Sequence, residues 1–341
     1  MNLWLELGAM AFITILAFGG TMAVAGLMSM AERRVSAFMQ YRYGPNRVGP
    51  LGLLQAAADG IKFLFKEDSM PEGAHPLFFR LAPILAAVPA FMTFAVIPFG
   101  LGDVTIPFLG VERPLVVADI PTGVIYFLAV GSLGVYGVIL AGWSSNSKFS
   151  LLGSIRSGAQ MLSYELALTL AMASAVLVSG SLSLHDIVLH QAKHGWNIAY
   201  QPVAFLIFLI AMFAETNRHP FDFAECEPEL VGGFHTEYSG WKFSLFFIGE
   251  YSAMIAMSGM VATLFLGGPL VPLLPIDSTP WWLSIIAFSL KAGFFLFFYL
   301  WVRWSLPRFR YDQLMDLGWK KLVPLAILNF AVTGAAVVFI P

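Results

Sequence analysis

The sequence predicts an all-α integral membrane protein, because its composition and its long apolar runs both point to a lipid environment. Hydrophobic residues make up 58% of the 341 positions and charged residues 12%, whereas a soluble domain has about 45–50% apolar and about 25% charged residues. The mean hydropathy of +0.76 agrees. This composition excludes a soluble globular domain and a disordered chain. The net charge of −2 leaves no basic surface for nucleic acid.

Apolar runs long enough to cross a bilayer follow one another along the chain. A transmembrane helix needs about 20 such residues. The expected spans are residues 7–31, 81–102, 120–147, 159–178, 203–214, 243–266, 281–302 and 322–341. The fifth is the shortest and lies between Lys193 and Glu215. We therefore expect about eight transmembrane helices in one membrane domain, residues 1–341.

The basic residues are distributed very unevenly between the two sets of loops. Sixteen of the 19 Lys and Arg residues fall in or beside the loops that follow the first, third, fifth and seventh spans. Arg113 and Lys193 are on the other side, and Lys291 is within a span. Loops rich in Lys and Arg stay on the cytoplasmic side. We therefore expect the basic loops to face the cytoplasm (or an organelle matrix) and both chain ends to face outward.

The sequence offers few groups that could bind a cofactor. A single cysteine, Cys226, excludes an intramolecular disulfide and the cysteine sets that hold iron–sulfur clusters. No glycine-rich nucleotide-binding motif is present. His185, His190 and His194 could suggest a metal, but no carboxylate or cysteine completes the set. We expect no metal site, and any electron or nucleotide chemistry should lie on another chain.

The first cytoplasmic loop, residues 32–80, contains an expected amphipathic helix at 51–66. Its apolar residues recur at helical spacing, namely Leu54, Ala57, Ala58, Ile61, Leu64 and Phe65. Such a helix can lie in the membrane interface, with Lys62 and Lys66 on lipid headgroups. Asp59 disfavours a simple surface anchor, because a carboxylate is unwelcome at an anionic surface. Both interpretations remain open from the pattern alone.

The second cytoplasmic loop, residues 215–242, combines acidic and aromatic residues. Its carboxylates are Glu215, Asp222, Glu225, Glu227, Glu229 and Glu237. The aromatic residues among them favour a loop that folds back into the protein at membrane depth. Clustered buried carboxylates have raised pKa values and share protons, which suits a proton relay. The alternative is that Arg218, His219 and Lys242 simply neutralise them.

Three charged residues, Glu165, Glu250 and Lys291, lie within the apolar runs. Each costs about 2.5–3.5 kcal/mol at the centre of a transmembrane helix. An ion pair between Glu165 and Lys291 is one explanation, but two acids and one base leave an acid over. A chain of protonatable groups is the favoured interpretation, and His219, which titrates near neutral pH, could join it.

Two segments carry a close resemblance to a known family. The segment 52–67, GLLQAAADGIKFLFKE, and the segment 220–230, PFDFAECEPEL, resemble the two signatures of the NuoH-type membrane subunit of respiratory complex I, NADH:quinone oxidoreductase. The shorter segments 31–34 and 43–50 also match. This family is the counterpart of the mitochondrially encoded subunit 1, and the resemblance covers the whole chain.

The resemblance implies that this chain forms the membrane part of a quinone access tunnel and couples quinone reduction to proton translocation. The tunnel residues would be Glu32, Arg34, Arg47, Asp59, Lys62, Phe221, Asp222 and Phe223. The proton path and its coupling to the tunnel would use Glu165, Glu215, Glu225, Glu227, Glu229 and Glu250. Weaker candidates are His219, Lys291 and Arg303.

The resemblance also implies a set of partners and a location. Flavin mononucleotide (FMN) and iron–sulfur clusters would lie on peripheral-arm subunits, with no cofactor on this chain and quinone as the substrate. Small membrane subunits, antiporter-like subunits and lipid would be its membrane partners, in a bacterial inner membrane. The alternatives are the homologous subunit of an ion-translocating hydrogenase, or a stand-alone proton-coupled transporter, although no internal repeat supports the transporter.

Overall fold

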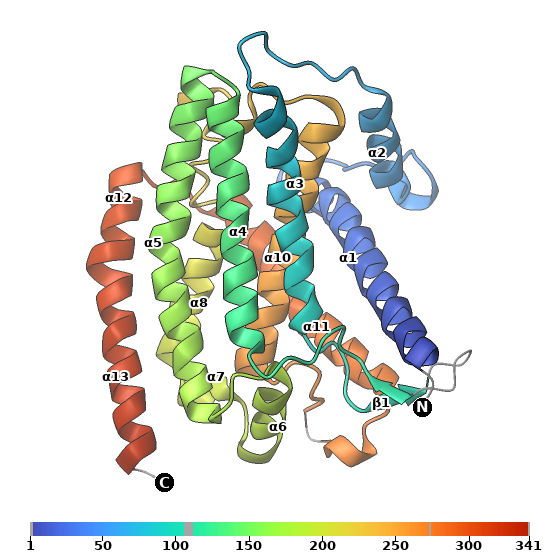
Figure 1. Cartoon of the computed structure of the whole chain (residues 1–341), viewed down its shortest axis with the longest axis vertical. Coiled ribbons are helices and arrows are strands. Elements are labelled where there is room, and N and C mark those ends of the chain that lie inside the picture. Colours follow the sequence, from blue (N-terminus) through green and yellow to red (C-terminus); the bar gives the residue numbers. More distant parts are fainter. Residues whose placement is uncertain (1–2, 106–111, 273, 340–341) are drawn as a thin grey trace.

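The computed structural model describes residues 3–105, 112–272 and 274–339. In this part of the chain the fold is a helical bundle, which confirms the predicted all-α membrane class (Figure 1). Seven helical segments are long and apolar enough to span a membrane. They are α1 Leu3–Met39, α3 Pro76–Met92 with its 3-10 extension η2 Thr93–Val96, α4 Gly123–Ser144, α5 Lys148–Ser179, α10 Gly240–Leu266, α11 Trp281–Ser305, and the run of α12 Tyr311–Asp316, η5 Leu317–Leu322 and α13 Val323–Phe339.

The fifth predicted span is the short helix α8, Pro202–Glu215. Its 14 residues cover about 21 Å at 1.5 Å per residue, less than the roughly 30 Å of hydrocarbon in a bilayer. Residues along most of α8 are buried among the neighbouring helices. The short helix is tolerated because protein, rather than lipid, surrounds its C-terminal half.

Several helices extend beyond the predicted apolar runs. α1 continues to Met39, so that Glu32 is in a helix and not in the loop after it. α5 begins at Lys148 instead of residue 159, and the last span begins at Tyr311 instead of residue 322. Hydropathy marks the part of a helix that can lie in hydrocarbon, whereas backbone hydrogen bonding carries the helix past that limit.

The helix of the first cytoplasmic loop is shorter than the predicted 51–66. It is α2, Gln55–Phe65, and a 3-10 turn, η1 Pro50–Gly52, precedes it. Leu51 and Gly52 have positive φ values of 54° and 74°, which an α-helix cannot contain. α2 lies beside α1 and α10, and its apolar residues Ile61, Leu64 and Phe65 are exposed.

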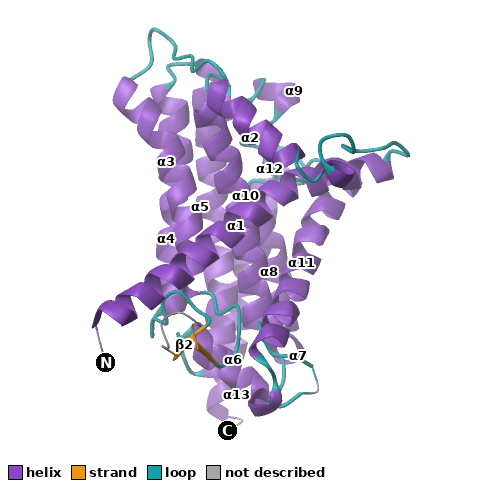
Figure 2. Cartoon of the chain, turned by 90° about the vertical axis from the view of Figure 1, so that its right-hand side faces the viewer, coloured by secondary structure: helices purple, strands orange, loops and turns teal. Residues whose placement is uncertain are grey.

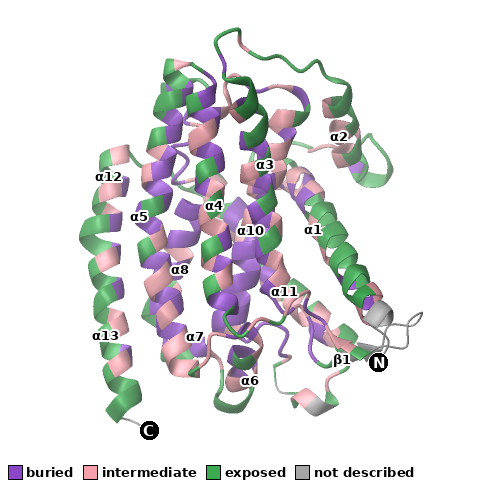
Figure 3. Cartoon of the chain, viewed as in Figure 1, coloured by how far each residue is buried: buried purple, intermediate pink, exposed green. Residues whose placement is uncertain are grey.

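The central helix of the bundle is α10. Figure 3 shows α10 mostly buried, with the more exposed α1 and α13 on opposite sides. Within the apolar window of each helix, 72% of α10 is buried, against 11% of α1 and 17% of the segment that ends in α13. Buried residues of α5, α8 and α10 form the main core.

The remaining elements lie at the two ends of the bundle. Figure 2 shows α2 and α9 at one end and α6, α7 and β2 at the other, where the helices nearest the two chain termini also point. These short elements are β1 Asp103–Thr105, antiparallel to β2 Glu112–Pro114, and α6 Leu184–His194, α7 Asn197–Tyr200, α9 Glu227–Leu230, η3 Gly233–His235 and η4 Ile276–Ser278.

Candidate functional site

The loop between α8 and α10 folds back into the bundle, as the mixture of acids and aromatics predicts. A glutamine from α5 holds it there. The Gln160 side-chain amide donates to the carbonyls of Ala214 and Phe221, each at 2.7 Å. Phe221 and Phe223 are 4% and 1% exposed. Their burial positions the polar residues between and beside them at membrane depth.

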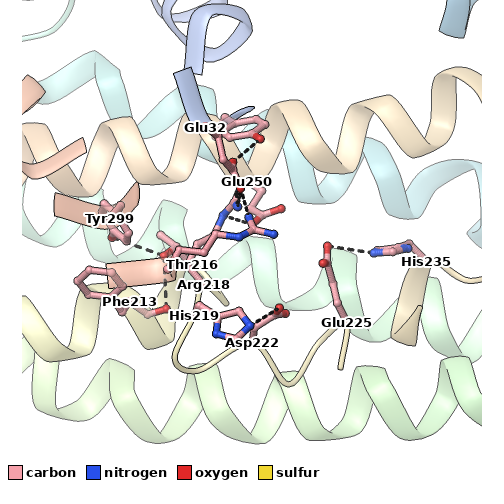
Figure 4. Close-up of polar contacts among 12 residues, drawn as sticks. Glu32, Phe213, Thr216, Arg218, His219, Asp222, Glu225, His235, Glu250 and Tyr299 are labelled. Atoms are coloured by element: carbon pink, nitrogen blue, oxygen red, sulfur yellow. Dashed lines mark hydrogen bonds and ion pairs between the residues drawn. The ribbon is translucent and has the colours of Figure 1, made fainter. Parts of the chain in front are cut away.

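Arg218 is the centre of the site. Its guanidinium pairs with Glu32 of α1 at 3.3 Å and also pairs with Glu250 of α10 (Figure 4). The Arg218 side chain is 4% exposed. Burial alone would lower the pKa of Arg218, but the carboxylates of Glu250 and Glu32 hold that pKa well above its usual value. A permanently charged guanidinium therefore joins two acids from two different helices.

Two further groups hold Glu32. The Tyr251 hydroxyl donates to Glu32 at 2.7 Å, and Arg303 of α11 also pairs with this carboxylate. The Arg218 guanidinium lies 4.8 Å from the centre of the Tyr251 ring. Because a buried polar group is costly unless it is paired and hydrogen-bonded, these contacts compensate the burial of the Glu32 carboxyl group and fix its position.

A second cationic centre is formed by Arg308, after α11. Arg308 contacts Asp222 at 3.2 Å, His219 at 3.1 Å and the thiol sulfur of Cys226 at 3.5 Å. Burial and repulsion from Glu225 raise the pKa of Asp222 to about 7, against the opposing charge of Arg308. Burial and the positive charge of Arg308 lower the pKa of His219. Asp222 can therefore change its charge near neutral pH.

Glu225 pairs with His235 at 3.1 Å (Figure 4). Burial alone would raise the pKa of Glu225, but the hydrogen bond and charge of His235 lower it. Asp222 and Glu225 are three residues apart, and their pKa values are shifted in opposite directions. Environments that separate pKa values in this way leave one carboxyl group protonated and its neighbour ionised over a range of pH.

An internal cavity of about 110 Å³ lies between α3, α4, α10 and the 216–235 segment, and we call it the acid cavity. Three carboxylates line it, Glu215, Glu225 and Glu250, together with His235. Most of the other lining residues are apolar, among them Phe127, Phe247 and Met257. Its volume and polar groups satisfy the requirements for ordered water.

A larger cavity of about 560 Å³ lies between α1, α2 and α10, and we call it the α1–α2 cavity. Glu32 and Asp59 line it, with Arg33, Phe63 and Phe243. Asp59 pairs with Arg33 at 2.7 Å. Phe247 lines both this cavity and the acid cavity, so its ring separates them.

The structure places the other sequence-predicted tunnel residues apart from these two linings. Phe221 packs on Tyr164 and Phe309, and Phe223 packs on Tyr311. Arg34 donates to the Leu51 carbonyl. Arg47 and Lys62 are exposed and line neither cavity, and Asp222 pairs with Arg308 as described above.

The predicted proton-path residues are also separated. Glu229 is exposed and pairs with Arg156 at 2.6 Å, and Glu165 is half-buried on α5. Lys291 does not pair with Glu165. Its ammonium donates to the carbonyls of Leu266, Gly268 and Leu270 at 2.7–2.9 Å, so it stabilises the C-terminal end of α10. The Glu227 side chain lies outside the described part of the structure.

Several residues of the site are absent from the sequence-based candidates. The sequence indicates Arg218 only as a charge that neutralises the loop acids. It indicates Arg308 only as one of the basic residues that predict the orientation in the membrane. His235 and Arg33 were not singled out. The signal that could have identified Arg218 and Arg308 is the excess of buried acid, since each buried carboxylate needs a cation. No local pattern identifies which arginine supplies it.

Among the side chains that the structure describes, no group of three or more His, Cys, Asp or Glu is arranged to hold a metal ion. The three histidines His185, His190 and His194 are in α6, where the His190 and His194 rings stack 4.3 Å apart. In the described part of the chain the site consists of acids, arginines and two cavities.

The class of membrane protein that this arrangement represents is identified by comparison with known families. A sequence model of the family described as NADH dehydrogenase matches residues 11–334. The chain is 55% identical over 326 residues to an H-type subunit of NADH-quinone oxidoreductase from Geobacter sulfurreducens, covering 95% of each chain. It is 54% identical over 316 residues to the H-type subunit from Thermomicrobium roseum, covering 90% of this chain and 89% of the relative.

A third relative extends the match over nearly the full length. The H-type subunit from Salinibacter ruber is 48% identical over 349 aligned residues, which cover 98% of this chain and 96% of the relative. The chain therefore belongs to the NuoH-type family of membrane subunits of NADH-quinone oxidoreductase, respiratory complex I. This confirms the resemblance seen in the two sequence signatures.

Proposed function

We propose that this chain is the membrane subunit of complex I that admits quinone from the bilayer and couples its reduction to proton translocation. The observation that carries the proposal is the position of Arg218. This guanidinium pairs with Glu32, which lines the α1–α2 cavity, and with Glu250, which lines the acid cavity. A change of charge at one cavity therefore alters the electrostatic interactions at the other cavity, because both involve Arg218.

The α1–α2 cavity is the quinone route in this proposal. It lies beside two helices that face lipid or the interface, and its wall combines aromatic rings with a few charged groups. Apolar walls with a few convergent polar groups are typical of sites for small ligands. Asp59 and Glu32 would orient the polar headgroup, and the aromatic rings would contact the apolar part of quinone.

The acid cavity begins the proton path. Glu225, Glu215 and Glu250 share one enclosed space, and water there would connect their carboxylates. Asp222 lies outside this lining but its pKa is raised to about 7, so it can take up or release a proton near neutral pH. Glu165 and Glu229 would extend the path from the cavity.

Electrons would reach quinone from other subunits. The names of the relatives place the family in an NADH-quinone oxidoreductase, and the single cysteine favours iron–sulfur clusters and FMN on peripheral-arm partners. Antiporter-like and small membrane subunits would receive the coupling within the bilayer. We propose an inner-membrane location with both chain ends on the outer side, because the basic loops would then face the cytoplasm.

The assembly is tested by purification of the tagged chain in mild detergent and mass spectrometry of its partners. NADH dehydrogenase and antiporter-like subunits are expected. A nickel–iron hydrogenase in their place would contradict the quinone substrate, and a chain that purifies alone would favour a stand-alone transporter.

The quinone route is tested by narrowing the α1–α2 cavity. Ala56 lines this cavity, whereas its neighbour Ala57 is exposed on the other face of α2. We expect Ala56→Trp to raise the KM for long-tailed quinones more than for short-tailed ones, while Ala57→Trp leaves both unchanged. Equal kinetics in the two variants, with the complex assembled, would overturn the assignment of this cavity.

A further inference from the structure

Two further cavities lie at the end of the bundle opposite α2, away from the site described above. One is an apolar cavity of about 320 Å³ between α1, α3 and α4. The other, of about 270 Å³, lies beside it, between α1 and the segment 113–119. Val117 lines both. We define the two together as the outer groove.

The inner part of the outer groove presents an apolar surface. The rings of Phe18 and Phe91 pack on each other, with their centres 4.8 Å apart, and form part of its wall. Three hydroxyl-bearing residues, Thr14, Thr21 and Tyr126, also line it, but each hydroxyl donates to a backbone carbonyl at 2.8–3.4 Å. The groove is therefore suited to a hydrocarbon chain.

The outer part of the groove carries charges of both signs. Arg113 and Asp119 line the smaller cavity, and Glu6, at the start of α1, pairs loosely with Arg113 at 3.6 Å. Arg113 is one of only two basic residues of the sequence in the loops of this side, the other being Lys193. A basic residue here is unusual, since this side of the protein is otherwise poor in cations.

Backbone hydrogen bonds fix these charges relative to the apolar part. The Phe99 amide donates to the Leu115 carbonyl at 3.1 Å, and the Ala118 amide donates to the Ala95 carbonyl at 2.8 Å. The segment that carries Arg113 and Asp119 is thereby held alongside the end of the α3 segment. The charged and apolar parts of the groove are therefore held in a fixed position relative to each other.

From this arrangement we propose that the outer groove binds one zwitterionic phospholipid with an ammonium headgroup, of the phosphatidylethanolamine type. An acyl chain would lie in the apolar cavity, against the paired rings of Phe18 and Phe91. The phosphate would contact Arg113, and the headgroup ammonium would contact Asp119, with Glu6 beside it. A purely anionic headgroup fits less well, because the two carboxylates outnumber the one guanidinium.

Burial of the acyl chain in the groove is favourable relative to water. Transfer from lipid gains far less, since the surrounding bilayer is equally apolar. The headgroup contacts therefore decide which phospholipid is retained when detergent replaces the bilayer. This difference makes the proposal measurable on the intact complex.

The test measures phospholipids retained by the assembled, detergent-purified complex, by native mass spectrometry and quantitative lipid analysis. Arg113→Gln removes the phosphate contact, and Ala17→Phe fills the apolar cavity. The matched controls are Lys193→Gln, at the other cation of this side, and Ala11→Phe, on the exposed surface of α1. We expect each test variant to retain about one phosphatidylethanolamine molecule fewer per complex than wild type and the controls.

Equal phosphatidylethanolamine retention in wild type, Arg113→Gln and Ala17→Phe would overturn the proposal. Loss of an anionic lipid in place of phosphatidylethanolamine, or loss in Ala17→Phe alone, would overturn the headgroup assignment. Should Ala17→Phe fail to assemble, Arg113→Gln, an outward-loop substitution, still tests the headgroup. The readout is lipid content, so the result does not depend on the proposed quinone route or on proton translocation.

Discussion

Removal of the Arg218 charge is the most informative perturbation of the site. Arg218→Gln leaves Glu32 with Arg303 and Tyr251, but Glu250 then has no cation within 4.0 Å in the described part of the chain. Breaking a buried ion pair by removing one partner costs about 3–5 kcal/mol. We expect a destabilisation in this range, because the Arg218 side chain is 4% exposed and that of Glu250 is 22% exposed.

The assay is the rate of irreversible thermal inactivation of the purified complex, since a large membrane assembly does not unfold reversibly. If the cost falls mainly on the native state, inactivation should accelerate by about 10²- to 10⁴-fold, at 1.36 kcal/mol for each factor of ten. The double variant Arg218→Gln with Glu250→Gln should recover much of this loss, because it leaves no unpaired charge at Glu250.

A matched control is Arg310→Gln, since Arg310 is 75% exposed and pairs with the exposed Asp312 at 2.9 Å. Exposed pairs contribute at most about 1 kcal/mol, so this variant should inactivate at nearly the wild-type rate. The reasoning is refuted if Arg218→Gln behaves like Arg310→Gln, or if the double variant is no more stable than the single one.

Three further predictions concern Asp222, Lys291 and Asp59. The pKa of Asp222 is about 7 in the folded protein, against 3.8 for the ordinary side chain. The stability that protonated Asp222 contributes should therefore be lost as pH rises from about 4 to 7. Asp222→Asn should flatten the pH dependence of thermal inactivation in that window, and an unchanged slope would contradict the raised pKa. Lys291→Met should cost at least about 1.5–3 kcal/mol, the value of one hydrogen bond to a charged group, because three carbonyls lose their donor. Faster proteolysis after α10 would report this loss, and wild-type resistance would contradict it. Asp59→Asn should leave thermal stability nearly unchanged, since the pair with Arg33 is partly exposed, but should impair quinone turnover. Kinetics equal to wild type across quinone tail lengths would favour the surface-anchor role of α2.

The sequence predicts the membrane class and most of the spans because long apolar runs have few alternatives in lipid. It predicts the ends of the helices less well, since α1 and α5 continue through polar residues that hydropathy assigns to loops. The sequence indicates α8 as the shortest of the expected spans. Its tolerance depends on tertiary burial, which hydropathy does not report.

The candidate site shows a similar division. Glu250 is recognisable from its cost in an apolar run, and Glu32, just beyond the end of a run, is recognisable from the family resemblance. Their partner is not, because Arg218 meets them only when α1, α8 and α10 pack together. The two cavities, and Phe247 between them, are likewise products of packing and leave no trace in local sequence patterns.

The central claim, that carboxylates of the acid cavity couple quinone reduction to proton translocation, is tested most directly in proteoliposomes that contain the assembled complex. The measurements are the rates of NADH-driven quinone reduction and of proton translocation in Glu215→Gln, with Glu237→Gln as the control. Glu215 lines the acid cavity, and Glu237, in the same loop, does not. We predict that Glu215→Gln lowers NADH-driven quinone reduction and proton translocation, while Glu237→Gln matches wild type. Wild-type turnover and translocation in Glu215→Gln would contradict the account.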